Sequence, residues 1–92
     1  MAILSQEQAL ALAKAHVDEI ADSVGDKFDV AVEKIIESDF GWIFFYNSKE
    51  FIETGNPISS LVGNGPIFVK HDGTVHDLPS ATGWEVAIQG IN

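Results

Sequence analysis

The sequence predicts an α+β fold in which one N-terminal helix packs on a mostly antiparallel sheet of four or five strands. Three observations support this fold class. Helical periodicity is confined to residues 5–25, alternation of apolar and polar residues follows it, and glycine-containing turns separate the later apolar runs. Ninety-two residues with 46 % apolar content suffice for one core, so we expect a single domain over residues 1–92.

The first expected element is a helix that begins at a capping box. Ser5 can accept a hydrogen bond from the Gln8 backbone, and the Gln8 side chain can reach back to Ser5. We expect Gly25 to end the helix in a left-handed conformation. The predicted apolar stripe comprises Ala9, Leu12, Ala13, His16, Val17, Ile20 and Val24.

Two strands are expected next. Residues 28–38 alternate in polarity, which predicts one half-buried strand. After a short connection at 39–41, residues 42–47 are apolar on both faces, as in a strand at the middle of a sheet. On that strand, one face carries Trp42, Phe44 and Tyr46, and the other carries Ile43 and Phe45. We expect Trp42 to be a core residue.

The second half of the chain begins with a long connection over residues 48–62, whose first residues can form a capped helical turn. A glycine-rich turn follows, in which Gly63 and Gly65 are expected to supply positive φ values and Pro66 to begin a strand at an edge or bend. The Asp72-Gly73 pair predicts a hairpin between residues 67–69 and 75–78. Residues 84–88 alternate and predict a final strand.

One helix can cover only one face of such a sheet. The strand at 42–47 is apolar on its second face as well, so that face needs a cover. We expect the cover to be the connection at 48–62, a second copy of the chain, or a partner.

Composition restricts the possible partners and the compartment. Fourteen acidic residues oppose five lysines and no arginine, which gives a net charge of -9 and argues against nucleic-acid binding. The same charge favours fast association with a basic partner. There is no cysteine, no apolar run of membrane-spanning length and no signal-peptide pattern, so we expect a cytoplasmic protein without membrane contact.

No residue pattern indicates catalysis. The three histidines, His16, His71 and His76, lack the spacing of a metal site, and no serine stands in a nucleophile motif. We expect neither enzyme activity, metal nor cofactor. The remaining charged feature is a set of acids in which Asp18 and Asp22 lie one helical turn apart, while Glu33 and Glu37 share one face of the next strand. These acids form either a solubilising face or a docking surface.

Two motifs resemble those of a known family. Gly41, Trp42 and residues 44–48 match a GW.FFYNS pattern, and residues 63–67 match a GNGPI turn. The chain thereby resembles the YrhB-like, or immunity protein 35, family of bacterial polymorphic toxin systems. The resemblance implies a small cytoplasmic α+β protein that binds a cognate toxin and occludes its active site. From the net charge of -9 we expect that toxin to be basic. A YrhB-type member is also associated with chaperone-like behaviour.

Two other functions stay open from the sequence: a chaperone that holds unfolded clients on the open sheet face, and a homodimeric module that buries this face against a second copy. A neighbouring toxin gene would favour immunity. Trp84 follows a glycine loop, so we expect it to be partly exposed. The residues predicted to bind a partner are Asp18, Asp22, Glu33, Glu37, Phe51, Asn56, Asn64 and Trp84, and those predicted to build the structural motif are Trp42, Gly63, Gly65 and Pro66.

Overall fold

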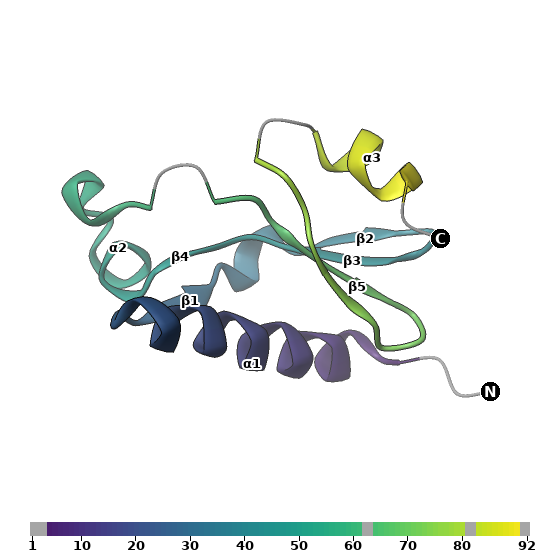
Figure 1. Cartoon of the computed structure of the whole chain (residues 1–92), viewed down its shortest axis with the longest axis horizontal. Helices are drawn as coiled ribbons and strands as arrows, with labels where there is room; N and C mark the ends of the chain where they lie inside the picture. Colours follow the sequence, from purple (N-terminus) through teal and green to yellow (C-terminus); the bar gives the residue numbers. More distant parts are fainter. Residues whose placement is uncertain (1–3, 62–63, 81–82, 91–92) are drawn as a thin grey trace.

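The computed structural model describes residues 4–61, 64–80 and 83–90, and it has the predicted α+β architecture (Figure 1). The helices are α1 (Gln6–Val24), α2 (Lys49–Thr54) and α3 (Trp84–Ala87), with three short 3₁₀ helices, η1 (Val32–Lys34), η2 (Pro57–Ser59) and η3 (Ile88–Gly90). The strands are β1 (Phe28–Val30), β2 (Ile36–Ser38), β3 (Gly41–Phe44), β4 (Tyr46–Ser48), β5 (Ile67–Lys70) and β6 (Val75–Asp77).

Helix α1 begins and ends as predicted. The backbone N–H of Gln8 donates to Ser5 Oγ at 3.2 Å, and the backbone N–H of Ser5 donates to Gln8 Oε1 at 2.9 Å. Together these bonds satisfy two N–H groups that the helix itself leaves unpaired. Gly25 caps the other end with φ 70°, in the left-handed region.

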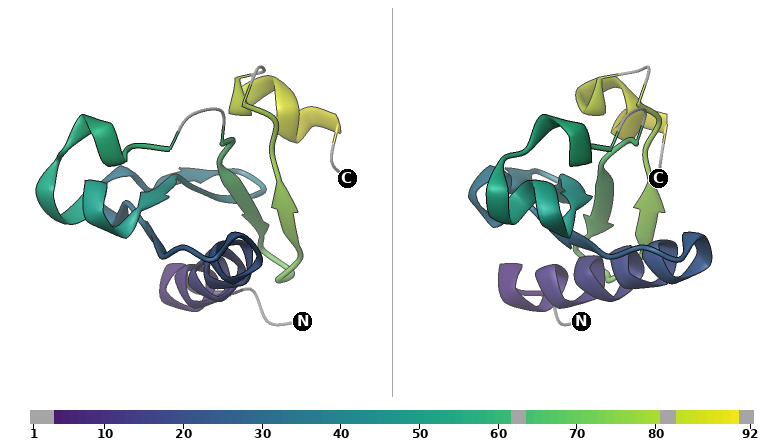
Figure 2. Two further views of the ribbon diagram at one scale, coloured as in Figure 1. Left: turned by 60° about the vertical axis from the view of Figure 1, so that its left-hand side comes forward. Right: turned by 90° about the vertical axis from the view of Figure 1, so that its left-hand side faces the viewer.

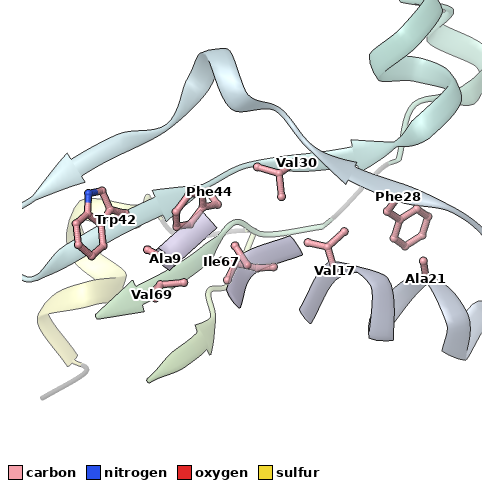
Figure 3. Close-up of a cluster of buried hydrophobic side chains, with 10 residues drawn as sticks. Ala9, Val17, Ala21, Phe28, Val30, Trp42, Phe44, Ile67 and Val69 are labelled. Carbon is pink, nitrogen blue, oxygen red and sulfur yellow. The ribbon is translucent and has the colours of Figure 1, made fainter. Parts of the chain in front are cut away.

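The buried stripe of α1 is narrower than predicted. Leu12 and Val24 were expected in the stripe but are exposed, because full burial is limited to one residue per turn, while Ile20 is partly buried against the core. Figure 3 shows this stripe against the sheet, with Phe44, Ile67 and Val69 opposite it. The first core therefore lies between α1 and the strands. The stripe consists of Ala9, Ala13, Val17 and Ala21.

The strands form a four-stranded antiparallel sheet in the order β2-β3-β5-β6 and a separate antiparallel pair, β1-β4. β3 lies inside the larger sheet, between β2 and β5, so the predicted central position is confirmed for residues 42–44. The prediction of one strand over residues 42–47 is wrong, because the strand is interrupted at Phe45 and the following residues form β4, which pairs with β1 outside the larger sheet. The predicted faces are confirmed. Trp42, Phe44 and Tyr46 contact the first core, while Ile43 and Phe45 contact a second core on the opposite face.

The prediction of one strand over residues 28–38 is wrong, because η1 divides it into β1 and β2. Val30 pairs with Tyr46, and Ile36 pairs with Ile43, so residues 31–35 lie opposite residues 44 and 45 alone. The residues in excess on this side do not pair and include the 3₁₀ helix η1, so the interruption resembles a large β-bulge. The bend separates the pair β1-β4 from the larger sheet.

The prediction of a final strand over residues 84–88 is also wrong. This segment forms α3 and η3, in which the N–H groups of Val86 and Ala87 both donate to the carbonyl of Gly83. Trp84, Ala87 and Ile88 contact the second core, at the i, i+3, i+4 spacing of a helix face, whereas Val86 is exposed.

The second face of the sheet is therefore covered by α3, which corrects the expectation that the connection at 48–62, a second copy or a partner would cover it. Figure 2 shows α1 and α3 on opposite sides of the sheet. Ile43, Phe68, Leu78 and Ile88 form the buried second core. The connection instead forms α2 and η2 beside the pair β1-β4 (Figure 1).

Gly65 does not have the positive φ value that was expected of it. A Cβ at this position would lie 1.8 Å from the carbonyl oxygen of Leu78, so close backbone approach is what requires a glycine here. The next residue, Pro66, stands directly before β5, and its carbonyl accepts from the N–H of Leu78 at 2.9 Å. Gly63, the other glycine of the predicted turn, lies outside the described residues.

The predicted hairpin and the predicted helical turn are both confirmed. Val69 pairs with Val75 across the turn that contains Asp72 and Gly73. Ser48 caps α2 by accepting a hydrogen bond from the N–H of Phe51 at 3.1 Å. Within the described part of the chain, no helix is long and apolar enough to cross a membrane.

Candidate functional site

The surface chemistry of this protein is dominated by carboxylates without lysine partners. Among the described residues, the only ion pair joins His16 Nε2 and Asp77 Oδ1 at 2.9 Å. It links α1 to β6, and the described acids of the α1 C-terminus and of α2 form no salt bridge. Exposed carboxylates without a partner keep their attraction for an incoming positive surface.

These acids meet at the end of the molecule where the α1 C-terminus approaches α2 (Figure 1). A groove of about 720 Å³ runs between the start of β1 and the segment α2–η2, and a smaller hollow of about 350 Å³ adjoins it along α1. We call the two together the acidic end. The groove is lined by Asp26, Lys27, Ser48, Lys49, Glu50, Glu53, Thr54, Ile58 and Ser59, and the hollow adds Asp18, Ala21, Asp22 and Phe28.

One of these acids, Asp22, lies in the last turn of α1, where a carboxylate is unfavourable for the helix. Asp18 and Asp22 occupy the last two turns of α1, and the last turn contains no basic residue. The C-terminus of a helix carries a partial negative charge, so a carboxylate there is unfavourable by about 0.3–1 kcal/mol.

The two motifs of the family resemblance meet on the other side of α2. The amide nitrogen of Asn64 donates to the carbonyl of Tyr46 at 2.9 Å. Asn47 Oδ1 accepts from the N–H of Leu61 at 2.7 Å, and Asn47 Nδ2 donates to Ser60 Oγ at 3.2 Å. Two asparagine side chains thus hold the connection against β4.

A second groove, of about 310 Å³, opens at this junction, and we call it the motif groove. Its walls come from η1, the chain around β4, α2 and the turn before β5. Its lining includes three aromatic side chains, those of Phe45, Tyr46 and Phe51, whereas more than half of the residues that line the acidic end are charged. The lining residues are Ala31, Glu33, Lys34, Phe45, Tyr46, Asn47, Phe51, Ile52, Asn64, Gly65 and Pro66.

Tyr46 forms part of this lining and is held in its neutral form. Burial raises the pKa of its phenol, and the carboxylate of Asp77 raises the pKa further, while the Asn64 side chain acts weakly in the opposite direction. The ring also packs against Phe28, with centroids 6.0 Å apart. A neutral, packed phenol contributes an aromatic wall with a hydrogen-bonding group.

The residues predicted to bind a partner fall on different parts of the surface. Asp18 and Asp22 line the acidic end, whereas Glu33, Phe51 and Asn64 line the motif groove. The prediction that Glu33 and Glu37 share one strand face is wrong, because η1 takes Glu33 out of the strand that contains Glu37.

Two further residues that were predicted to bind a partner, Asn56 and Trp84, do not join the acid-lined grooves. The side chain of Asn56 accepts from the N–H of Ile58 at 3.1 Å and thereby caps η2. Trp84 is half-buried against the second core, on α3, and Figure 1 shows α2 and α3 at opposite ends of the molecule. Trp42 is 4 % exposed, as expected of a core residue.

Sequence reasoning missed three residues of the acidic end, Glu50, Glu53 and Ile58. The predicted helical turn after Ser48 would have placed Glu50 and Glu53 together, since residues three apart on a helix share a face. No sequence pattern marks Ile58. Its exposure follows from the 3₁₀ turn that carries it.

Two of the histidines pack against aromatic side chains. His71 stacks edge-on against Trp42 at 5.0 Å between ring centroids, and His76 lies beside Phe68 at 6.2 Å. Among the described residues, no three histidine, aspartate or glutamate side chains lie close enough to hold a metal ion.

The described residues form a small α+β fold whose surface carries acidic side chains without salt-bridge partners. The family model for immunity protein 35 matches residues 7–89, and the chain therefore belongs to the immunity protein 35 family. Its name assigns the family to toxin-immunity systems, with a toxin as the general kind of partner.

One curated relative is the uncharacterized protein YrhB of Escherichia coli strain K12. It is 38 % identical over 50 residues, a segment that covers 53 % of this chain and 53 % of the relative. The match thus spans about half the length of that relative. No solved structure matches the chain at a significant level.

Proposed function

We propose that this protein is a cytoplasmic immunity protein of a polymorphic toxin system, which binds its cognate toxin and blocks the toxin's active site. Family membership supports the class of function. Inhibition of this kind requires occupancy of the cleft and no chemistry of its own.

The acidic end is the observation that supports binding to the toxin's active site. Its two hollows are lined by five carboxylates and two lysines. A toxin that acts on a negatively charged substrate presents basic side chains around its cleft, and the acidic end would meet them as a substrate mimic. Complementary charge of this type speeds association, and its effect falls with salt.

The expected interface is limited in size. A standard complex buries roughly 800 Å² on each partner. The total accessible surface of this chain is 5711 Å², so one interface covers a single end of the molecule. We place that interface on the acidic end, with Phe51 and the motif groove at its border and Trp84 outside it.

The structure removes the reason for proposing a chaperone or a homodimeric module. Both the chaperone and the homodimer depended on an uncovered apolar sheet face, and α3 covers that face with Trp84, Ala87 and Ile88. No feature of the described residues favours either alternative over immunity.

The test uses the toxin encoded beside the immunity gene and two matched double variants. Asp18→Lys with Asp22→Lys changes the acidic end, and Asp39→Lys with Glu85→Lys makes the same change in net charge at exposed positions that do not line it. We expect the first pair to slow association at least tenfold at low salt and the second pair to change it much less. Wild-type protein should inhibit the toxin in vitro and protect cells that express it.

Two results would contradict the proposal. Absence of any complex between the wild-type protein and the toxin would remove the immunity function. Equal effects of the two charge-reversal pairs would show that net charge, and not the acidic end, controls association.

A further inference from the structure

Ile58 is the most exposed large apolar side chain among the described residues, at 91 %. The other exposed large apolar residues lie between 38 % and 64 %. A single exposed apolar residue on a flexible loop has no special meaning. Ile58 differs because the backbone that carries it is held in place, and because it lines the groove of the acidic end.

The backbone on both sides of Ile58 is fixed by hydrogen bonds. Asn56 Oδ1 accepts from the N–H of Ile58 at 3.1 Å, and the carbonyl of Asn56 accepts from the N–H of Ser59 at 3.0 Å. Pro57 restricts φ at the first position of η2. A turn whose backbone is already ordered loses little backbone conformational entropy when its side chain binds, which favours affinity.

The same turn is tied to the buried part of the molecule. Ser48 is 6 % exposed, and its hydroxyl donates to the carbonyl of Ser59 at 2.5 Å. The hydroxyl of Ser59 also donates to the carboxylate of Glu50. The position of Ile58 is thus fixed relative to α2 and β4, the elements that build the groove.

Charged groups surround this apolar side chain. The groove brings Asp26, Glu50 and Glu53 to the same surface, together with Lys27 and Lys49, and the adjoining hollow adds Asp18 and Asp22. An apolar centre within a polar, charged border is the usual arrangement of a protein interface. Residues that contribute most to affinity fill a pocket on the partner and are shielded by such a border.

We propose that Ile58 is the apolar anchor of the toxin interface and enters a non-polar pocket bordered by lysine or arginine side chains on the toxin. This inference rests on the proposed function and names the part of the acidic end that sets the lifetime of the complex. The carboxylates govern how fast the complex forms, and Ile58 governs how slowly it dissociates.

The test measures binding kinetics of the full chain against the toxin encoded beside the gene. We expect Ile58→Ala to raise the dissociation rate at least tenfold and to leave the association rate within twofold. The loss should persist at high salt, because the contact is apolar. Glu53→Gln should instead lower the association rate, and that effect should shrink at high salt.

Val86→Ala is the matched control, since Val86 is also a mostly exposed aliphatic residue, 64 % exposed on α3 at the other end of the molecule. It should leave both rates within twofold. Thermal melting should show Ile58→Ala and Val86→Ala folded with nearly unchanged midpoints, because neither side chain is packed.

The outcomes separate this inference from the proposed function. Binding by wild type with a dissociation rate unaffected by Ile58→Ala would overturn the anchor and leave the immunity function standing. No binding by wild type would overturn both. A wild-type dimer in light scattering that Ile58→Asp dissociates would assign Ile58 to self-association and would also overturn the proposal.

Discussion

Removing the charge of Asp22 should stabilise the fold while weakening the toxin complex. Asp22 lies in the last turn of α1, next to the helix end and four residues after Asp18. The helix dipole makes a carboxylate there unfavourable by about 0.3–1 kcal/mol, and repulsion between like charges one turn apart adds about 0.2–0.5 kcal/mol. Asn and Asp have similar helix propensities, so Asp22→Asn isolates the charge.

The expected gain is about 0.5–1.5 kcal/mol at low ionic strength. For a domain of this size, 1 kcal/mol corresponds to a shift in Tm of about 4–8 °C. Differential scanning calorimetry at low salt measures it, and a repeat near 1 M salt should remove most of the gain, because the Debye length falls to about 3 Å.

The control is Glu7→Gln at the other end of the same helix. Glu7 lies in the first turn, where the dipole favours a carboxylate, so its neutralisation should lower Tm. If self-repulsion of the net charge of -9 were the cause, both variants would gain stability. A rise in Tm for both, or no change for Asp22→Asn, would refute the reasoning. In binding kinetics, Asp22→Asn should associate more slowly than wild type.

Three further predictions concern single residues. Gly65→Ala should cost about 1–3 kcal/mol in thermal melting, since its Cβ would meet the Leu78 carbonyl oxygen at 1.8 Å, and an unchanged midpoint would contradict that contact. Ser48→Ala should cost about 1–2 kcal/mol in urea unfolding because it removes a buried cap, and a loss below the error of the measurement would count against it. Hydrogen bonds from Thr74 lower the pKa of Asp72, so its stabilising effect is present above the unfolded value of about 3.9 and is lost as pH falls through the folded pKa. The Tm difference between wild type and Asp72→Ala should therefore narrow toward pH 2, and a constant difference would exclude this linkage.

The parts of the fold that sequence predicts well have local causes. The capping box at Ser5, the left-handed Gly25 and the Asp72-Gly73 turn each act within a few residues of their position. The alternation at Trp42 and Ile43 likewise assigns the two faces of β3 correctly. These features are predictable because neighbouring residues determine them.

The wrong predictions of secondary structure concern segments whose conformation depends on contacts with residues far away in the sequence. Residues 28–38 alternate like a strand, but β1 pairs with β4, and β2 pairs with β3 in a different register. The residues left between β1 and β2 form η1. Trp84, Val86 and Ile88 also alternate, yet Ala87 completes a helical face that the uncovered sheet stabilises. Local pattern cannot distinguish these cases, because the competing arrangement depends on residues far along the chain.

The candidate site was predictable only in part for the same reason. Asp18 and Asp22 could be placed on an exposed helix face from their spacing. Their proximity to Glu50, Glu53 and Ile58 depends on how α2 packs against the pair β1-β4, which no local pattern contains.

The position of α3 in the chain has a consequence for truncated forms of the protein. This helix follows all six strands in sequence, so a chain cut before residue 84 keeps every strand of the sheet but lacks its second cover. Ile43 and Phe68 are both fully buried in the protein, and the face that carries them loses Trp84, Ala87 and Ile88 in such a chain. A frameshift or stop codon near residue 83 would therefore leave an apolar sheet face exposed, and the product should aggregate.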